Sequence, residues 1–325
     1  MQTLRQFQEI FHSYLQENQF RNQPRELYEP VNYILSIGGK RLRPVLVLMS
    51  QALFDEKIEK SLPAAFAVEV FHNFTLLHDD IMDEAPLRRG KPTVHIKYDV
   101  NTGILSGDVM MIAAYDFLAK IADESKIPAL YKTFNKVAIE VCEGQQYDMN
   151  FETRDDVTIP EYLRMIELKT SVLLAGAMQM GAIIGNASAA DAEHIYQFGR
   201  NVGLAFQIQD DILDTFGDPE KFGKKVGGDI VQNKKTYLVL KALEVADETN
   251  KKDLQTLMTT PTINEEIKIL TVKNIFNQLN IRNLAETLKE DYLKTAFEHL
   301  EAVAVPKERK QELINLANDL MMREV

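Results

Sequence analysis

Long helices are the feature of this sequence that most restricts its fold. The chain has 325 residues but only 15 Gly and 11 Pro, so few residues interrupt regular structure. Apolar residues recur at spacings of three and four, as at Leu4, Phe7 and Phe11, which is the period of an amphipathic helix. The sequence has no run of alternating β-branched residues between hairpin turns, so a sheet is not expected. We therefore predict an all-α fold, a large helical bundle formed as a single domain over residues 1–325.

Five long helices are expected before Thr236, and further amphipathic helices follow it. They cover residues 63–81, 104–121, 128–149, 160–184 and 189–214. Thr158 and Glu161 have the spacing of a capping box at the start of the fourth helix, and Ser188 precedes the fifth. The most apolar stretch, 172–184, is about a dozen residues long, which is too short to span a bilayer and suits a buried helix.

Charge and cysteine content exclude several classes of protein. The net charge is −11, from 48 acidic and 37 basic residues, which disfavours a general nucleic-acid binder. The single cysteine, Cys142, excludes an internal disulfide framework and a CxxC zinc site. A reducing, cytoplasmic compartment is expected. Residues 1–20 lack the apolar segment of a signal peptide, and no transmembrane segment is expected.

Two DDxxD motifs each follow an apolar helix, at residues 79–83 and 210–214. On a helix, positions i, i+1 and i+4 fall within an arc of about 100°, so each motif places three carboxylates on one face. Carboxylates at a helix C-terminus oppose the macrodipole and repel one another, so bound cations are expected to offset them. Oxygen-only ligands favour Mg²⁺, with Mn²⁺ as an alternative. The predicted metal ligands are Asp79, Asp80, Asp83, Asp210, Asp211 and Asp214.

Basic segments near these motifs predict a diphosphate site. GGKRLRP occupies residues 38–44, RRGKPT occupies 88–93, and Lys-Thr pairs stand at 169–170 and 235–236. Arginine grips a phosphate with a planar fork, whereas lysine acts as a point charge. The charges of six aspartates, six basic side chains, three divalent ions and two diphosphates sum to about zero.

These motifs, in this order, resemble those of the trans-isoprenyl diphosphate synthases, also called polyprenyl synthetases. The likeness runs from the GGKRLRP segment to the KKT segment at 234–236. It implies an all-α bundle around a deep cavity, a homodimer, and Mg²⁺ ions that hold an allylic diphosphate between the two aspartate motifs. It also implies ionisation of the allylic diphosphate and carbon–carbon bond formation with isopentenyl diphosphate.

The resemblance assigns roles to individual residues. Allylic-diphosphate contacts fall on Arg88, Lys169 and Lys234. Isopentenyl-diphosphate contacts fall on Lys40, Arg43, His72 and Arg89. Thr170 and Gln207 match positions beside the reacting carbons. The full catalytic set implied in this way is Asp79, Asp80, Asp83, Arg88, Lys169, Thr170, Gln207, Asp210 and Lys234.

Two histidines and one lysine have competing interpretations. A histidine on an apolar helix is usually a satisfied core residue, and only the position of His72, seven residues before Asp79, favours a role in binding. His78 is interpreted as structural. Lys224, in a Gly-rich segment, is either a lid residue or plain surface.

Product length in such enzymes depends on the helix before the first motif. Phe74 stands five residues before Asp79, where the family sets product length, and a bulky ring there is expected to form a floor. Phe71 lies one turn earlier, and Thr75 replaces the second aromatic of one farnesyl-type class. Plain core packing is the alternative for both rings. A short product, of twenty or fifteen carbons, is predicted.

Other functions remain open from the sequence alone. A longer-chain synthase would keep the motifs but not the floor. A class I terpene cyclase would have one DDxxD motif and no isopentenyl site, a non-catalytic subunit should have lost aspartates or arginines, and a structural acidic protein would bind cations without diphosphate. The sequence departs from the family pattern at its last residues. Residues 321–325 are MMREV, whereas many members of the family end in basic residues.

Overall fold

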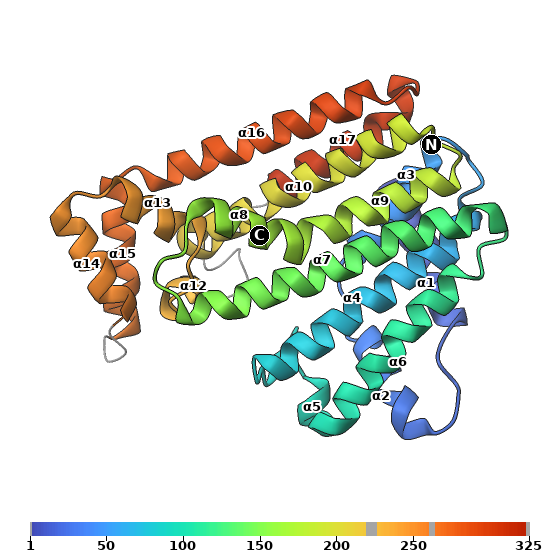
Figure 1. The fold of residues 1–325 in the computed structure, drawn as a ribbon, viewed down its shortest axis with the longest axis horizontal. Coiled ribbons are helices and arrows are strands. Elements are labelled where there is room, and N and C mark those ends of the chain that lie inside the picture. Colours follow the sequence, from blue (N-terminus) through green and yellow to red (C-terminus); the bar gives the residue numbers. More distant parts are fainter. Residues whose placement is uncertain (1, 219–225, 260–263, 323–325) are drawn as a thin grey trace. The chain divides into compact units, whose positions relative to one another are not determined.

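The computed structural model describes residues 2–218, 226–259 and 264–322. Helices form nearly all of the regular structure in these ranges (Figure 1), which confirms the all-α fold class. Among the described residues, no helix has both the length and the apolar character that a membrane crossing requires. Lys224, the candidate lid residue, and the last three residues of the chain lie outside the described residues.

The described chain forms two compact units. Unit 1 comprises Met1–Asn135, Gly176–Ile195 and Ala304–Glu312, and unit 2 comprises Lys136–Ala175, Tyr196–Val303 and Leu313–Val325. The single domain expected from the sequence stays a prediction.

Unit 1 is built mainly from the N-terminal helices. Its elements are α1 (Leu4–Glu17), α2 (Arg25–Ser36), α3 (Leu42–Ala52), the 3₁₀ turn η1 (Ile58–Ser61), α4 (Leu62–Met82), the strands β1 (Leu87–Arg88) and β2 (Lys91–Pro92), α5 (Val94–Lys97), α6 (Val100–Leu118) and the 3₁₀ turn η2 (Glu124–Lys126). Helix α4 is mainly apolar before its last turn and packs along α6. Gly107 of α6 makes this approach close, because a Cβ there would lie 2.6 Å from Cδ2 of His78.

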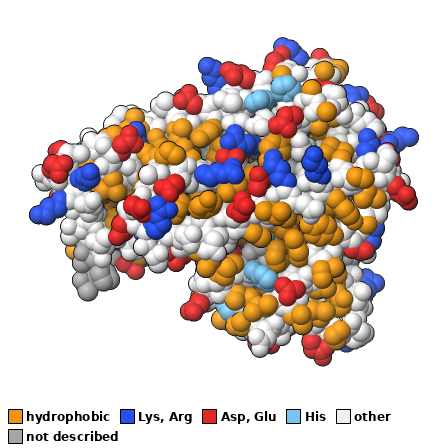
Figure 2. Space-filling model, viewed as in Figure 1, with side chains coloured by type: hydrophobic (Ala, Val, Ile, Leu, Met, Phe, Trp, Pro, Cys, Tyr) orange, Lys and Arg blue, Asp and Glu red, His pale blue; other side chains and the backbone are white. Residues whose placement is uncertain are grey.

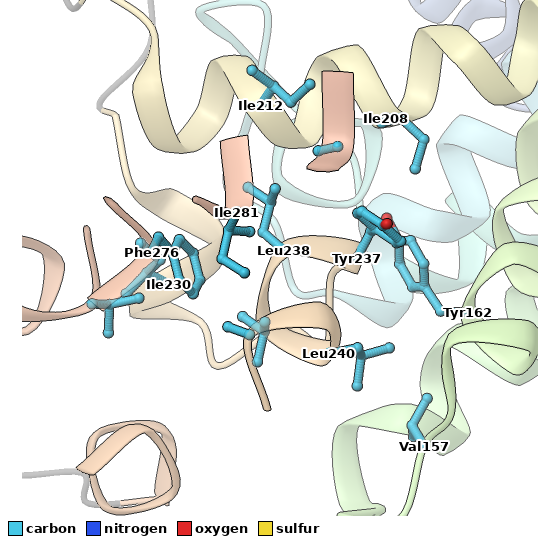
Figure 3. Close-up of a cluster of buried hydrophobic side chains, with 14 of the residues drawn as sticks. Val157, Tyr162, Ile208, Ile212, Ile230, Tyr237, Leu238, Leu240, Phe276 and Ile281 are labelled. Carbon is cyan, nitrogen blue, oxygen red and sulfur yellow. The ribbon is translucent and has the colours of Figure 1, made fainter. Parts of the chain in front are cut away.

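Unit 2 holds the helices that follow. Its elements are α8 (Ile159–Ile166), the π-helical turn η3 (Glu167–Ser171), α12 (Gly228–Val231), α13 (Tyr237–Val245), α14 (Glu248–Thr259), α15 (Glu265–Gln278) and α16 (Ile281–Ala302). Helices with residues in both units are α7 (Ile127–Thr153), α9 (Val172–Ile184), α10 (Ala189–Phe216) and α17 (Lys307–Met321). Figure 3 shows part of the buried core of unit 2, to which α8, α10, α13 and α15 contribute side chains.

Local sequence signals explain several helix starts. Thr158 caps α8, and both bonds of the capping box with Glu161 are present, as predicted. Ser188 accepts a hydrogen bond from the Asp191 amide at the start of α10, at 3.0 Å. Helix α9 is buried along most of its length, which confirms the expectation for the apolar stretch.

Two expectations were wrong in detail. The described residues do contain a sheet, formed by β1 and β2 as an antiparallel pair. Its turn is Arg89-Gly90, and both residues have positive φ, 52° and 74°, as a tight two-residue hairpin requires. Strands of two residues are too short to leave an alternating pattern. The helix expected over 160–184 is likewise interrupted by the π-helical turn η3.

Candidate active site

The sequence-predicted site residues are divided between the two units. Unit 1 holds Lys40, Arg43, Phe71, His72, Phe74, Thr75, Asp79, Asp80, Asp83, Arg88 and Arg89. Unit 2 holds Lys169, Thr170, Gln207, Asp210, Asp211, Asp214 and Lys234. The structure brings members of each group together within its own unit.

The first aspartate motif ends helix α4 of unit 1. Asp80 is 3% exposed and accepts two hydrogen bonds from Arg88, from Nε at 2.8 Å and from Nη2 at 2.7 Å. Asp79 Oδ2 lies 3.8 Å from the same Nη2, and Asp83 is the exposed C-cap of the helix. The β1–β2 hairpin thus returns Arg88 to the helix end, where its fork offsets the carboxylate charge.

The GGKRLRP segment forms a backbone turn just before α3. Gly38 and Gly39 have φ values of 92° and 125°, which favour glycine. Gly39 also lets Arg89 approach, because a Cβ there would lie 2.7 Å from the Arg89 guanidinium carbon. Arg89 donates a hydrogen bond to the Gly38 carbonyl. Lys40 lies on this turn and is exposed.

Glu69 anchors the turn from inside α4. Glu69 is 2% exposed, and its carboxylate accepts a hydrogen bond from the Arg41 guanidinium. Asn73 Nδ2 donates to the same carboxylate at 2.7 Å, and Arg41 also donates to the Leu35 carbonyl. The sequence reasoning missed Glu69, although an isolated carboxylate in an apolar helical run was a signal that could have found it.

Arg43 and His72 form a buried pair in unit 1 that could bind an anion. Arg43 Nη1 lies 3.1 Å from His72 Nε2. Burial, followed by the positive charges of Arg43 and Arg89, holds the pKa of His72 well below its ordinary value, so the ring is neutral and accepts the bond. Burial lowers the pKa of Arg43 to about 10, while Glu69 acts in the opposite direction. Arg43 Nε is buried and has no hydrogen-bond partner within the described ranges. A desolvated guanidinium with a spare donor suits an anionic ligand.

The aromatic side chains proposed to set product length form a chain of contacts in unit 1. The rings of Phe71 and Phe74 lie 5.7 Å apart, and Phe71 also contacts Phe134 at 5.2 Å. His78 contacts Phe74 at 4.8 Å between ring centroids and lies against α6. Thr75 donates its hydroxyl to the His72 carbonyl at 2.8 Å.

The second aspartate motif ends helix α10 of unit 2, and its middle aspartate is bound differently. Asp211 is 6% exposed. Its Oδ2 accepts a hydrogen bond from the Tyr162 hydroxyl at 2.6 Å and another from the Tyr237 amide at 3.3 Å; Figure 3 shows both tyrosines in the core of unit 2. Burial raises the pKa of Asp211 well above its ordinary value, as do the charges of Asp229 and Asp210. Burial also raises the pKa of Tyr162 well above its ordinary value, so the phenol keeps its proton and donates.

Asp214 and Asp229 extend this acidic region. The Asp229 amide donates to Asp214 Oδ2 at 3.0 Å. Burial, with the charge of Asp229, raises the pKa of Asp214 to about 6. Asp210 is exposed beside them. Asp229 and Tyr162 were missed by sequence reasoning, and no local spacing marked either residue.

The basic side chains of unit 2 pair with acids. Lys169 Nζ lies 2.6 Å from Asp148 Oδ2, and Lys234 Nζ lies 3.6 Å from Asp229 Oδ1. Thr170 and Gln207 are half-buried. Asp148 was not predicted, because it falls within the helical pattern of α7 without a distinguishing neighbour.

The acidic residues fit a hard divalent cation that takes some of its ligands from the protein and others from a substrate. Within the described ranges, no three His, Cys, Asp or Glu side chains are arranged to hold a metal by themselves. Mg²⁺ commonly keeps several waters and takes phosphate oxygens, so it does not need a complete protein cage. Burial, together with the charge of Asp229, raises the pKa values of Asp211 and Asp214, and a bound cation would favour their ionised forms.

Comparisons with known proteins identify the family. The polyprenyl synthetase family model matches residues 24–276. The chain belongs to the polyprenyl synthetase family. It is 44% identical over 222 residues to a geranylgeranyl diphosphate synthase of Methanosarcina mazei, covering 68% of each chain. It is 41% identical over 237 residues to a geranylfarnesyl diphosphate synthase of Natronomonas pharaonis, covering 67% of this chain and 69% of the relative. A solved geranylgeranyl pyrophosphate synthase superposes with a TM-score of 0.95 at 49% identity, over the full length of both chains. This polyprenyl synthetase is therefore a prenyltransferase.

Proposed function

We propose that this prenyltransferase joins isopentenyl diphosphate to an allylic diphosphate, head to tail, and releases diphosphate. The product is an all-trans prenyl diphosphate of twenty carbons. The observation that carries the proposal is the Arg43–His72 pair of unit 1, because Arg43 presents a desolvated guanidinium with a spare donor beside neutral His72. A cyclase acts on one diphosphate and has no need of this second anion-binding pair in addition to two aspartate motifs.

Each charged group has a role in this reaction. Arg43, His72, Arg89 and Lys40 bind the diphosphate of isopentenyl diphosphate. Arg88, Lys169 and Lys234 bind the allylic diphosphate and stabilise the charge that develops as its carbon–oxygen bond breaks. Thr170 and Gln207 lie beside the reacting carbons, and the released diphosphate accepts the final proton.

The aspartate motifs hold divalent cations. Asp79, Asp83, Asp210 and Asp214 supply carboxylate oxygens, and three Mg²⁺ ions balance the charges. Asp80 and Asp211 each have a carboxylate oxygen bound by a protein donor. We propose that these two aspartates contribute less to cation binding than the other four. Bound Mg²⁺ would neutralise negative charge on the departing diphosphate.

Phe74 sets the product at twenty carbons. Its ring packs against Phe71, which in turn packs against Phe134, and it is the floor that stops the growing chain. One helical turn rises about 5.4 Å, which is roughly one isoprene unit, so replacement of a single floor residue can change the product length. The products in the names of the two relatives differ by one isoprene unit, since one is a geranylgeranyl and the other a geranylfarnesyl diphosphate synthase by name.

We also propose that the protein is a homodimer and acts in the cytoplasm. Several apolar side chains of α5 and α6 are exposed, and Figure 2 shows hydrophobic side chains gathered on that part of unit 1. They include Ile96, Ile104, Leu105 and Ile112. Ile112→Lys should shift the mass measured by light scattering to that of a monomer. Ile139→Lys, at a comparably exposed site on α7, is the control and should leave the mass unchanged.

A product assay tests the function. Purified protein is incubated with Mg²⁺, isopentenyl diphosphate and dimethylallyl, geranyl or farnesyl diphosphate in turn, and products are measured by mass spectrometry. A twenty-carbon diphosphate supports the whole proposal. A product of fifteen or twenty-five carbons keeps the reaction and corrects the length, and one of thirty or more refutes the floor. No condensation by folded protein would favour a cyclase or a non-catalytic subunit.

Phe74→Ala tests the floor in the same assay. Removal of the ring should lengthen the product by at least one isoprene unit. Thr75→Ala, at the next position, removes only a small side chain and should change the product less. An unchanged distribution in Phe74→Ala would mean that the floor lies elsewhere.

A further inference from the structure

The Lys169–Thr170 pair lies in an irregular part of its helix. The chain leaves α8, forms the π-helical turn η3 at Glu167–Ser171, and continues as α9. A π turn inserts an extra residue into the helix, and it persists where surrounding contacts favour it, often at functional sites. The contacts that hold η3 therefore decide where Lys169 and Thr170 lie.

Two glycines allow helices on either side to press against this turn. A Cβ at Gly144 of α7 would lie 2.6 Å from the Leu168 carbonyl carbon. A Cβ at Gly203 of α10 would lie 2.8 Å from Cα and Cβ of Ser171. Both distances are shorter than van der Waals contact, so only glycine fits at either position without displacing the turn. Leu168 and Ser171 are accordingly 1% and 0% exposed.

An ion pair connects the first residue of the turn to α10. Arg200 donates two hydrogen bonds to Glu167, from Nε at 2.7 Å and from Nη2 at 2.9 Å. The side chain of Glu167 is 15% exposed and that of Arg200 is 31% exposed. Arg164 adds a single bond to the same carboxylate at 3.2 Å, and it is more exposed, at 49%. The two-bond geometry fixes direction as well as distance.

Helix α10 also carries Gln207 and the second aspartate motif. Gln207 follows Arg200 by seven residues, which is about two helical turns. Arg200 therefore joins the turn that bears Lys169 and Thr170 to the helix that bears Gln207 and Asp210. Lys169 is directed by a further contact within the same unit, its 2.6 Å approach to Asp148 on α7.

We propose that Arg200 is a positioning residue for the condensation, and that its ion pair with Glu167 holds the π-helical turn in the register that presents Lys169 and Thr170. The inference rests on the proposed function for its effect on rate. Its structural part, the bracing of η3 by Arg200, stands independently of which reaction the site performs.

Arg200→Gln removes the charge and the fork but keeps a polar side chain of similar reach. We expect kcat to fall about 10- to 100-fold, as misplacement of catalytic groups by about 1 Å does elsewhere. The KM for isopentenyl diphosphate should stay within about twofold, because its proposed contacts lie in unit 1. Glu167→Gln should have the same effect, and the double variant should lose no more than either single one, because one pair is broken in each.

The control is another ion pair of unit 2. Arg282 donates to Glu286 at 2.9 Å on α16, and its side chain is 56% exposed. Arg282→Gln should leave kcat, KM and the peptide exchange described next unchanged. Arg200→Lys keeps the charge and can form a single bond, so its kcat should lie between those of wild type and Arg200→Gln.

Hydrogen exchange measured by mass spectrometry tests whether Arg200 holds η3, and this test does not depend on enzyme activity. The peptide that contains residues 167–171 should exchange faster in Arg200→Gln than in wild type or Arg282→Gln. Inactive wild-type protein would refute the proposed function. The exchange result would still show whether Arg200 holds η3 in place. If Arg200→Gln does not fold, Arg200→Lys and Gly203→Ala, which displaces Ser171 and leaves the charges intact, take its place.

Two results would overturn the inference. One is kcat within twofold of wild type in folded Arg200→Gln, or in both Arg200→Lys and Gly203→Ala. The other is unchanged exchange of the 167–171 peptide in these variants. A loss of activity that merely follows the folded fraction, with exchange increased throughout unit 2, would assign Arg200 to general stability and would likewise refute a positioning role.

Discussion

Arg88 pairs with two of the aspartates that end α4 in unit 1, whereas a further carboxylate, Asp229, lies beside those that end α10 in unit 2, with Lys234 next to it. In unit 1, Asp80 is gripped by Arg88. In unit 2, the equivalent Asp211 is held by a neutral phenol and a backbone amide, and Asp229 adds further negative charge. Two motifs with the same spacing therefore lie in different electrostatic surroundings.

The pKa shifts of neighbouring groups report this contrast. Beside the first motif, burial and four arginines keep His72 neutral. At the second motif, burial and neighbouring carboxylates raise the pKa of Asp214 to about 6. In unit 1, Arg88 offsets the charge of Asp80, and Arg43 keeps a donor for an anion. Unit 2 carries negative charge that favours bound cations. The sequence spacing alone does not reveal this division.

The largest expected effect comes from removing the first aspartate of either motif. Asp79→Ala and Asp210→Ala should each lower kcat at least about 100-fold, because an anchor for the charge on the departing diphosphate is lost. The helical circular dichroism spectrum should not change, since neither side chain is deeply buried. Near-normal turnover in either variant would contradict a mechanism that uses both motifs.

The thermal midpoint in the presence of Mg²⁺ sharpens the same comparison. Asp210→Ala should lose more of the stabilisation by Mg²⁺ and inorganic diphosphate than Asp79→Ala, because Asp229 adds a further carboxylate beside the second motif. Equal losses would show that the surroundings of the two motifs do not determine how each depends on cations.

The next effect concerns the middle aspartates. Tyr162→Phe removes the 2.6 Å bond to Asp211 and leaves a buried carboxylate with one fewer donor. We expect the free energy of unfolding to fall by about 1–3 kcal/mol, as measured by urea denaturation. Asp80→Asn keeps an acceptor for Arg88, which is 22% exposed and can reach solvent, so its loss should be smaller. A larger loss for Asp80→Asn would reverse the assignment of which motif depends on its protein donor.

Helical periodicity was enough to predict most of this fold. Apolar spacing placed both aspartate motifs at helix ends, and the Thr158–Glu161 box marked the start of α8. The β1–β2 hairpin was missed because a strand of two residues has no period. The π-helical turn η3 was missed because one extra residue barely changes a helical pattern over 160–184.

Contacts between distant residues account for what the sequence could not reveal about the site. Tyr162 and Asp211 are 49 residues apart, and Glu167 and Arg200 are 33 apart. Neither pair belongs to a local motif, so only packing brings its members together. Glu69 is the exception, because a carboxylate within the apolar part of α4 must find a partner when buried, and that requirement is visible in the sequence.

The smallest expected effect tests the arginine surroundings of unit 1 through pH. The pKa of His72 is lower in the folded protein than the ordinary value of 6.5, so the unfolded chain binds more protons just below that pH. The stability that neutral His72 contributes is complete above pH 6.5 and declines as the pH falls, by at most about 1.4 kcal/mol per pH unit. Urea denaturation between pH 5 and 7.5 should show a shallower slope in His72→Gln than in wild type. His12→Gln, on the exposed side of α1, controls for the loss of a histidine from the same unit. An undiminished slope in His72→Gln would mean that burial among arginines does not keep this ring neutral, and the electrostatic contrast between the two motifs would then rest on unit 2 alone.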